Sequence, residues 1–191
     1  MSLKDMLNAG EFISAPGVFD PLSARIVDAS PAKAMYMTGY GVSASLLGKP
    51  DAGLVSYREM VDRVRSICEV TDAPLIADGD TGFGGLANVR QAVQGYETAG
   101  ASAIQLEDQQ YPKRCGHTRN RKVIPAVDMA QKVKMAVDSR FSDDFLIIAR
   151  TDARTEHGLD EALRRAEIYI KAGADILFLE SPESLEEMRI V

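Results

Sequence analysis

The feature that most constrains the fold is a regular alternation of apolar runs with amphipathic segments. In each run the apolar positions follow one another instead of alternating with polar ones, which is typical of strands buried on both faces. Such strands, separated by helical segments, predict an α/β fold with a parallel sheet covered by helices. The predicted strands are Phe12–Val18, Ala34–Thr38, Pro74–Asp78, Ala103–Glu107, Phe145–Arg150 and Asp175–Glu180.

The segments between these strands have apolar residues at the three- and four-residue spacing of a helix. Gly100 and Gly173 lie where a helix gives way to a strand, the usual position of a C-terminal cap. Each predicted helix therefore has one apolar face for the sheet. These faces are Met60, Val61, Val64, Ile67 and Cys68; Leu86, Val89, Val93 and Tyr96; and Leu159, Leu163, Ala166 and Ile170.

Polar residues collect where the predicted strands end. No Gly-rich dinucleotide fingerprint follows the first strand, which weakens a Rossmann prediction, whereas a (β/α)8 TIM-type barrel gathers all its strand ends at one mouth. We therefore predict one barrel domain over residues 1–191. Six βα units are present where a closed barrel has eight, so the predicted barrel is truncated before its last two strands. The strand-end residues are Thr38, Asp78, Asp80, Glu107, Arg150, Asp152 and Glu180.

Composition excludes several classes of protein. The net charge of −6 argues against a nucleic-acid binder, which would have a basic stripe. No apolar run approaches the roughly 20 residues of a membrane span, and the N-terminus does not resemble a signal peptide. The two cysteines form neither a disulfide framework nor a metal-type spacing. A cytoplasmic protein is the prediction.

Two carboxylates flank a glycine directly after the third predicted strand, in Asp78-Gly79-Asp80. Glu107 ends the next strand, where a barrel would place it beside them. Acidic groups crowded at one mouth repel one another unless a cation neutralises them, and oxygen ligands of this kind suit Mg²⁺, with Mn²⁺ as a possible substitute. The sequence predicts a metal site at Asp78, Asp80 and Glu107. The alternative is an Asp-Gly turn on a solvated acidic rim.

The polar stretch 109–123 is long for a connection inside a compact domain, and such a length indicates a mobile active-site loop. It is rich in basic residues and contains Lys113, Cys115 and His117. Basic neighbours favour a thiolate, and a thiol placed there can exchange a proton with a carbanion. A solvated basic loop with an incidental cysteine is the alternative. Cys68, on an apolar helix face, is predicted to be a core residue.

Arg150 ends the fifth predicted strand, where a guanidinium can hold a substrate carboxylate in a bidentate pair. An ion pair with Glu107 or Glu180 is the alternative. None of the six strands ends in a lysine, which argues against a Schiff-base aldolase. His157 is predicted to be a surface residue.

Taken together and in order, these motifs resemble the isocitrate lyase / phosphoenolpyruvate mutase superfamily over essentially the whole chain. The segments that match are Tyr36–Ala44, Gly48–Asp51, Asp78–Asp80, Glu107 and Lys113–His117. The resemblance implies the catalytic residues Cys115, Lys113, His117 and Tyr36, with Cys115 as the general acid and Tyr36 as a candidate base. It implies Asp78, Asp80 and Glu107 as metal ligands, and Thr38, Gly39, Tyr40, Asp51, Gly116, Arg150 and Glu180 as substrate-binding residues.

The resemblance further implies an Mg²⁺-dependent carbon–carbon lyase. Its substrate would be a small anionic 2-hydroxy or 3-hydroxy acid of the 2-methylisocitrate or dimethylmalate type, cleaved through an enolate-like intermediate to a keto acid and a carboxylate. The segment 38–48 is more similar to the branch that contains dimethylmalate lyase, because methylisocitrate lyases usually have glycine at the position of Tyr40. The superfamily also implies a homotetramer.

Two groups of alternatives stay open. The same scaffold supports an oxaloacetate acetylhydrolase or a carboxyphosphonoenolpyruvate phosphonomutase. A different class of function is a non-catalytic, truncated barrel that works only in a larger assembly, since two unpaired sheet edges are a liability in solution.

Overall fold

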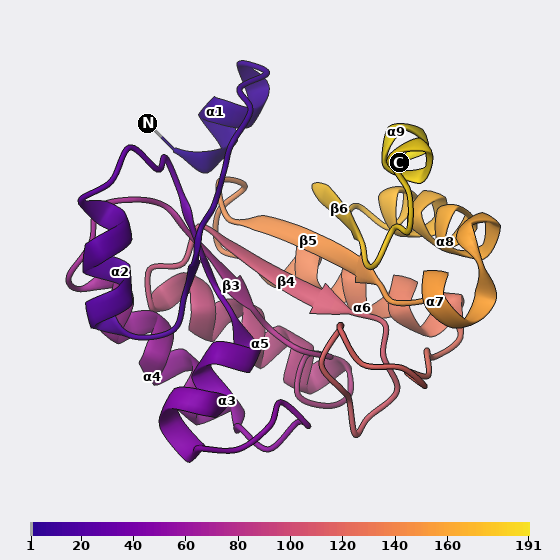
Figure 1. Ribbon diagram of the computed structural model, residues 1–191, viewed down its shortest axis with the longest axis horizontal. Helices are drawn as coiled ribbons and strands as arrows, with labels where there is room; N and C mark the ends of the chain where they lie inside the picture. The colour runs from indigo at the N-terminus through magenta and orange to yellow at the C-terminus, as the bar shows by residue number, and fades with distance from the viewer. Residues whose placement is uncertain (1) are drawn as a thin grey trace.

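A computed structural model describes residues 2–191 of the chain. Its centre is one sheet of six parallel strands in which each strand pairs with its neighbours in the sequence, in the order β1-β2-β3-β4-β5-β6 (Figure 1). This order and the intervening helices confirm the predicted α/β class. The strands are β1 (Gly17–Val18), β2 (Met35–Met37), β3 (Leu75–Asp78), β4 (Ala103–Glu107), β5 (Leu146–Thr151) and β6 (Ile176–Leu179).

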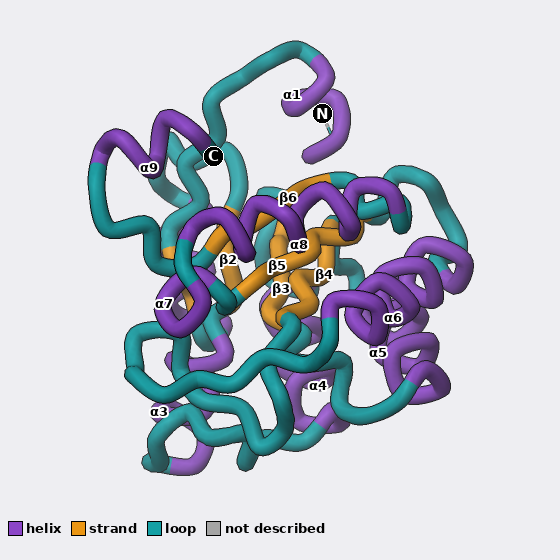
Figure 2. The backbone as a smooth tube through the Cα atoms, turned by 90° about the vertical axis from the view of Figure 1, so that its right-hand side faces the viewer, coloured by secondary structure: helices purple, strands orange, loops and turns teal. Residues whose placement is uncertain are grey.

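Helices cover the outer face of this curved sheet. In Figures 1 and 2 the long helices α4, α5, α6 and α8 wrap one side of the strands, while the other side remains open between the two ends of the chain. The helices are α1 (Leu3–Asn8), α2 (Pro21–Asp28), α3 (Gly39–Leu47), α4 (Tyr57–Cys68), α5 (Leu86–Thr98), α6 (Ala126–Ser139), α7 (Arg154–His157), α8 (Leu159–Lys171) and α9 (Leu185–Ile190).

Local signals fix where several of these helices begin and end. Ser56 starts α4 with a capping box, because its hydroxyl accepts from the Glu59 N–H and the Glu59 carboxylate accepts from the Ser56 N–H. Gly100 and Gly173 follow α5 and α8 with φ angles of 102° and 104°, a left-handed conformation that favours glycine, as predicted.

Side chains along each strand alternate between the helix-covered face and the interior of the barrel. In β4, Ile104 and Leu106 belong to the main core under the helices, whereas Gln105 points into the interior cavity. In β5, Ile147 lies in that core, and Arg150 lines the cavity. The interior positions become polar toward the carboxyl ends of the strands, and this change places the chemistry-bearing residues at the mouth.

The opposite end of the barrel is closed by α1. Leu3 and Met6 of this helix are buried against Ala34, Ala103 and Leu146, which lie at the amino ends of β2, β4 and β5. The polar mouth and the apolar plug therefore occupy opposite ends of the strands.

Several local predictions need correction. The first strand is confined to Gly17–Val18, and Phe12, predicted to begin it, has 92% of its surface exposed. Leu86 and Ile170 are also exposed, although the helical spacing assigned them to buried faces. On α8 the buried residues are Ala162, Arg165 and Tyr169, so the helix is rotated from its predicted orientation. Its predicted apolar side, Leu163, Ala166 and Ile170, instead lines a groove with Leu177, Leu179 and Val191.

The sheet is open along β6. Phe178 is exposed and Leu177 is half-buried, whereas every residue of β4 is buried. Six parallel strands with helices on one face and a mouth at their carboxyl ends form an incomplete (β/α) barrel, as predicted. Among residues 2–191, no helix is long and apolar enough to cross a membrane.

Candidate active site at the carboxyl ends of the strands

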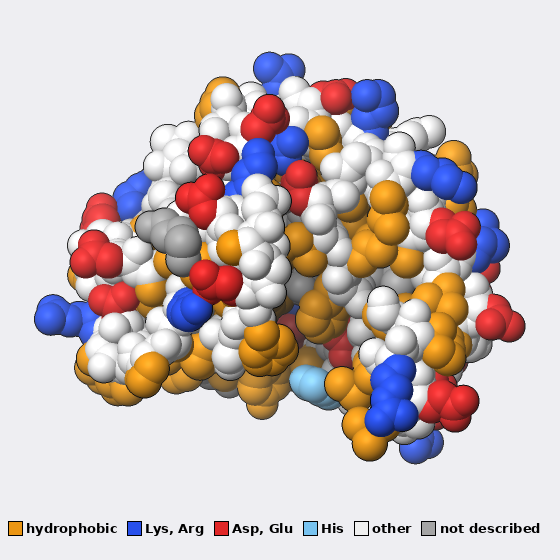
Figure 3. Space-filling view, turned by 90° about the horizontal axis from the view of Figure 1, so that it is seen from above, with side chains coloured by type: hydrophobic (Ala, Val, Ile, Leu, Met, Phe, Trp, Pro, Cys, Tyr) orange, Lys and Arg blue, Asp and Glu red, His pale blue; other side chains and the backbone are white. Residues whose placement is uncertain are grey.

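A cavity of about 510 Å³ occupies the interior of the barrel. Seen from above, the molecule is hollowed between its two ends (Figure 3). Apolar residues such as Ile76, Ile148 and Ile176 form the deeper wall. The mouth brings together ten predicted site residues: Tyr36, Thr38, Tyr40, Asp51, Asp78, Cys115, Gly116, His117, Arg150 and Glu180.

The turn after β3 places two buried carboxylates beside the start of α3. Asp78 Oδ2 accepts from the Gly39 N–H at 3.1 Å, and Asp78 Oδ1 accepts from the Asp80 N–H at 3.0 Å. The approach of Gly39 is close enough that a Cβ atom there would lie 2.6 Å from Asp78 Oδ2. Thr38, which precedes it, caps α3 and lines the cavity. Glycine is therefore needed where α3 meets Asp78.

Lys113 supplies a cation to this acidic region from the loop 109–123. Its Nζ lies 2.6 Å from Asp51 Oδ1 and 2.5 Å from Asp80 Oδ1, and its side chain is buried. The surrounding carboxylates raise the pKa of Lys113 against the opposing effect of burial. The prediction that Lys113 helps to create a thiolate at Cys115 needs correction, because its ammonium is held by Asp51 and Asp80.

One carboxylate of this region lacks a donor on one of its oxygens. Glu107 is buried, and its Oε1 has no hydrogen-bond partner. Burial raises the pKa of Glu107 well above its usual range, with opposition from Arg150, and burial raises the pKa of Asp80 to about 7. Within residues 2–191, no three His, Cys, Asp or Glu side chains are gathered tightly enough to form a metal site by themselves. Because Mg²⁺ keeps several waters and needs few direct carboxylates, the donor set of Asp78, Asp80 and Glu107 fits such an ion.

Tyr36 points from β2 into the same space. Its Oη accepts a hydrogen bond from Gln105 Nε2 at 2.7 Å. Burial raises the pKa of Tyr36 well above 10, and the nearby Asp78 raises it further. Tyr36 is consequently held as a neutral phenol. Sequence reasoning missed Gln105 because it lies in the middle of an apolar strand, where its glutamine side chain was the only signal.

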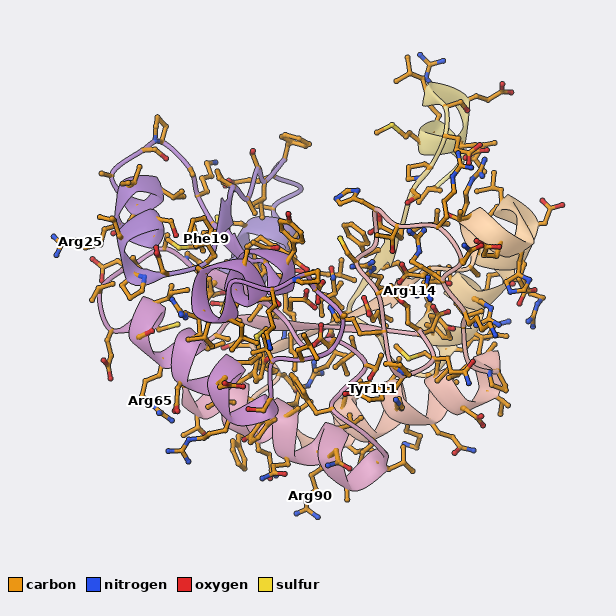
Figure 4. All side chains as sticks on the ribbon, turned by 60° about the horizontal axis from the view of Figure 1, so that its bottom comes forward. Phe19, Arg25, Arg65, Arg90, Tyr111 and Arg114 are labelled. Carbon is orange, nitrogen blue, oxygen red and sulfur yellow. The ribbon has the colours of Figure 1, made fainter. Side chains whose placement is uncertain are left out.

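The loop 109–123 passes over the mouth and is anchored on both sides. Gln109 pairs with Val123 across its base, and the Tyr111 hydroxyl donates to the Gly53 carbonyl at 2.9 Å. Tyr111 and Arg114 mark this loop in Figure 4, whereas Arg65 and Arg90 project from the outer helices, away from the sheet. Gly116 comes so close to the strand ends that a Cβ atom there would lie 2.3 Å from Arg150 Nη2.

Arg150 is held by three carboxyl groups. Its Nε and Nη2 donate to the two oxygens of Asp152 at 3.0 and 2.8 Å. Glu107 Oε2 lies 3.3 Å from Arg150 Nη1, and Glu180 Oε2 lies 3.3 Å from Arg150 Nη2. The ion pairs of Arg150 with Glu107 and Glu180, given above as the alternative interpretation, are therefore present. Asp152 is the carboxylate at the shortest distance from Arg150. Arg150 also lines the cavity, where an incoming anion would compete with these carboxyl groups for its guanidinium.

Behind this arginine lies a buried cluster around Asp108, which has no exposed surface. Its carboxylate accepts hydrogen bonds from the Thr151 hydroxyl, the Asp152 N–H, Arg165 Nη1 and the Tyr169 hydroxyl, at 2.7 to 3.0 Å. The cluster fixes the turn after β5 and thereby Asp152. Glu107 and Asp108 face opposite sides of the sheet, as the alternation of side chains along a strand would have predicted for neighbours.

Three other predictions concern cysteine and histidine. Cys68 is half-buried and packs on the main core, and burial raises its pKa to about 11. His157 is exposed, as predicted. Cys115 is half-buried at the cavity, next to Gly116 and His117.

Comparison with known proteins gives this geometry a context. The family model described as phosphoenolpyruvate phosphomutase matches residues 3–191. The 2,3-dimethylmalate lyase of Eubacterium barkeri is 50% identical over 187 residues, which cover 98% of this chain and 65% of that enzyme.

Two solved structures are also similar. An oxaloacetate acetylhydrolase in complex with 3,3-difluorooxalacetate superposes with a TM-score of 0.93 at 38% identity, covering 96% of this chain and 63% of that one. A phosphonopyruvate hydrolase complex with oxalate and Mg²⁺ has a TM-score of 0.90 at 33% identity, covering 98% and 65%. This chain thus spans less than two thirds of the length of these relatives. The match along nearly all its residues shows that the chain belongs to the isocitrate lyase / phosphoenolpyruvate mutase superfamily.

Proposed function

We propose that the protein acts as a divalent-metal-dependent carbon–carbon lyase on a small 2-hydroxy diacid of the dimethylmalate type. The observation that carries the proposal is the position of Cys115 at a cavity that is also lined by Arg150 and the acidic residue Asp78. A proton donor, an anion-binding guanidinium and a carboxylate cluster are the parts that an enolate-forming cleavage needs. The 50% identity to 2,3-dimethylmalate lyase supports this choice of substrate class.

Asp78, Asp80 and Glu107 would hold the metal ion. The unpartnered Glu107 Oε1 and the burial of Asp80 support this assignment, because a cation offsets the cost of ionised carboxylates in a buried place. A bound Mg²⁺ or Mn²⁺ would polarise the α-oxygen and carboxylate of the substrate and stabilise an enolate. Lys113 then neutralises Asp51 and the remaining charge of Asp80.

In the cleavage of 2,3-dimethylmalate, a base removes the proton of the C2 hydroxyl and the C2–C3 bond breaks. C2 becomes the keto carbon of pyruvate, and the electron pair stays on C3 as the enolate of propionate. The Cys115 thiol then delivers a proton to C3, which gives propionate. Arg150 binds a carboxylate of the substrate, with Glu180, Thr38 and the Gly39 segment completing the pocket.

Tyr36 serves in this scheme as a neutral hydrogen-bond donor. Its raised pKa keeps it protonated at neutral pH, so it cannot take up a proton there, and Gln105 occupies one lone pair of its oxygen. The phenolic proton is therefore directed away from Gln105 and is available to a substrate oxygen. A carboxylate at the mouth is a better acceptor for the hydroxyl proton than this neutral phenol.

Oxaloacetate acetylhydrolase activity is the second candidate, favoured by the similarity to a solved acetylhydrolase at a TM-score of 0.93. There, water attacks the C2 carbonyl of oxaloacetate, the C2–C3 bond breaks, and the products are oxalate and acetate. Both reactions produce a carbanion that Cys115 can protonate, so the cavity suits either.

The test is incubation of the protein with 2,3-dimethylmalate, 2-methylisocitrate or oxaloacetate in the presence of Mg²⁺, with the products identified by mass spectrometry. Pyruvate and propionate from dimethylmalate are the expected products. Oxalate and acetate from oxaloacetate would instead favour the acetylhydrolase. Rearrangement of carboxyphosphonoenolpyruvate, offered as a fourth substrate, would favour the mutase, and no turnover of any of these compounds would contradict the enzyme proposal.

We also propose a homotetramer, on the strength of the superfamily resemblance. Sedimentation of the same preparation measures its mass. A monomer without activity that regains activity on adding another chain would favour the assembly-dependent alternative.

A further inference from the structure

The carboxylate of Asp152 is shared by two arginines that come from different parts of the chain. Arg150, at the end of β5, donates Nη2 to Asp152 Oδ1 at 2.8 Å. Arg121, from the loop 109–123, places its Nε 3.1 Å from the same oxygen. All three side chains are buried, and Asp152 has no exposed surface. One carboxylate oxygen therefore links the loop to the guanidinium at the cavity.

Arg121 is held in this position by a set of further contacts. Its Nη1 donates to the Thr118 carbonyl at 2.8 Å, and its Nη2 donates to the Thr155 hydroxyl at 2.6 Å and to the Ser181 hydroxyl at 3.3 Å. Thr118 belongs to the loop, whereas Thr155 and Ser181 follow β5 and β6. A displacement of the loop therefore removes Arg121 from Asp152.

The charges around Arg150 make this displacement significant. Among residues 2–191, Glu107 and Glu180 lie within ion-pair distance of Arg150 alone, and Asp152 is shared between Arg150 and Arg121. Three carboxyl groups against one guanidinium leave little positive potential for an incoming anion. Arg121 takes part of the negative charge of Asp152 in a buried region, where electrostatic interactions are strong. More of the charge of Arg150 is then available toward the cavity.

We propose that Arg121 is a positioning residue that, through Asp152, increases the affinity of Arg150 for the carboxylate of a bound acid when the loop lies over the mouth. The inference rests on the proposed function insofar as Arg150 is the anion-binding group. It assigns a role to a loop residue that touches neither the cavity nor the proposed metal ligands, and it makes substrate affinity depend on loop position.

The experiment measures the affinity for oxalate, in Mg²⁺ buffer, by calorimetry. The variants are Arg121→Met, Asp152→Asn and their combination, with Arg119→Met as the control, since Arg119 is an exposed arginine of the same loop. Arg121→Met is expected to weaken oxalate binding on the order of ten-fold, within the usual range of coupling between sites. Arg119→Met should bind like the wild type, and Arg121→Lys, which keeps the charge, should recover much of the loss.

A double-mutant cycle tests the route through Asp152. If Arg121 acts through Asp152, adding Arg121→Met to Asp152→Asn leaves the affinity of Asp152→Asn unchanged. Equal affinities of Arg121→Met and Arg119→Met, or additive losses in the double variant, would overturn the inference. Thermal unfolding of each variant identifies those that fail to fold, and Thr155→Val, which removes one contact of Arg121 without changing charge, should weaken oxalate binding in the same direction.

A second measurement needs no ligand and separates this inference from the proposed function. Hydrogen exchange of the Arg150 Nε–H, followed by NMR, reports its bond to Asp152 Oδ2. Removing Arg121 leaves Asp152 to Arg150 alone, so exchange should slow in Arg121→Met and accelerate in Asp152→Asn. Absence of oxalate binding to the wild type would count against the proposed function, whereas unchanged exchange in Arg121→Met would count against the relay.

Discussion

The replacement Asp108→Asn tests how far the buried cluster behind the active site stabilises the fold. Asp108 has no exposed surface, and its Oδ2 accepts from the Thr151 hydroxyl at 2.8 Å, from Arg165 Nη1 at 3.0 Å and from the Tyr169 hydroxyl at 2.7 Å. Asparagine has nearly the same shape but no charge. Whichever way its amide is turned, an NH₂ group faces at least one donor that has lost its acceptor.

The expected loss of unfolding free energy is about 3 kcal/mol. Removing one partner of a buried ion pair typically costs about 3–5 kcal/mol, because the remaining charge is left uncompensated. Arg165 retains two other partners, Glu161 Oε1 at 2.8 Å and the Ile124 carbonyl at 2.9 Å, which places the estimate at the lower end. Since a domain is stabilised by only about 5–15 kcal/mol, this is a large fraction of the total.

Urea denaturation followed by circular dichroism measures the change. With a slope of roughly 2–3 kcal/mol/M, the midpoint should fall by about 1 M while the slope stays the same. Asp62→Asn is the matched control, because Asp62 also pairs with arginines, at 2.9 Å, but on the exposed side of α4. An exposed pair contributes little. Similar midpoint shifts for the two variants would refute the reasoning that burial, not pairing distance, sets the energy.

Four further outcomes are expected. Cys115→Ser should lower kcat by roughly 10²- to 10⁴-fold with nearly unchanged substrate affinity, because a hydroxyl is too weak an acid to replace the thiol. The control Cys68→Ser should leave kcat unchanged and cost about 1 kcal/mol of stability as a polar replacement in a half-buried site. Wild-type turnover by Cys115→Ser would exclude the general-acid role. Chelation should abolish turnover and Mg²⁺ or Mn²⁺ should restore it, with Asp78→Ala the most damaging ligand change in a metal titration; full activity in excess chelator would contradict the metal proposal. Hydrogen exchange across residues 109–123 should slow when oxalate and Mg²⁺ are added. The variant Gly116→Ala should reduce that slowing, because its Cβ would collide with Arg150. Identical exchange with and without ligand would argue against a closing loop. Hydrogen bonds from Arg164 and Arg165 lower the pKa of Glu161 to about 2, so the stability that ionised Glu161 contributes is present above its unfolded pKa of 4.5 and is lost as the pH falls toward 2. The stability difference between wild type and Glu161→Gln, less than about 1 kcal/mol for so exposed a group, should vanish over that range. A difference that persists at pH 2 would disprove the lowered pKa of Glu161.

The sequence was most informative where a residue's role follows from its place along a strand. Apolar runs located five of the six strands to within about two residues, because a doubly buried strand needs an uninterrupted apolar segment. Asp78, Arg150 and Glu180 were predicted to lie together because a parallel barrel must bring its strand ends together, and all three line one cavity. The first strand was predicted too long, since an apolar run at the edge of a sheet, such as the one beginning at Phe12, need not be paired.

What the sequence by itself determined was the class of the fold, the end of the barrel at which the polar side chains gather and the types of side chain found there. Which charges pair was decided only by the tertiary structure. Lys113 and Arg121 are both loop cations in the sequence, yet one neutralises Asp51 and Asp80 and the other meets Asp152. The physical reason is that strand and helix periodicity is a local property of the chain, whereas the partner of a buried charge is whichever opposite charge the folded backbone brings within about 3 Å.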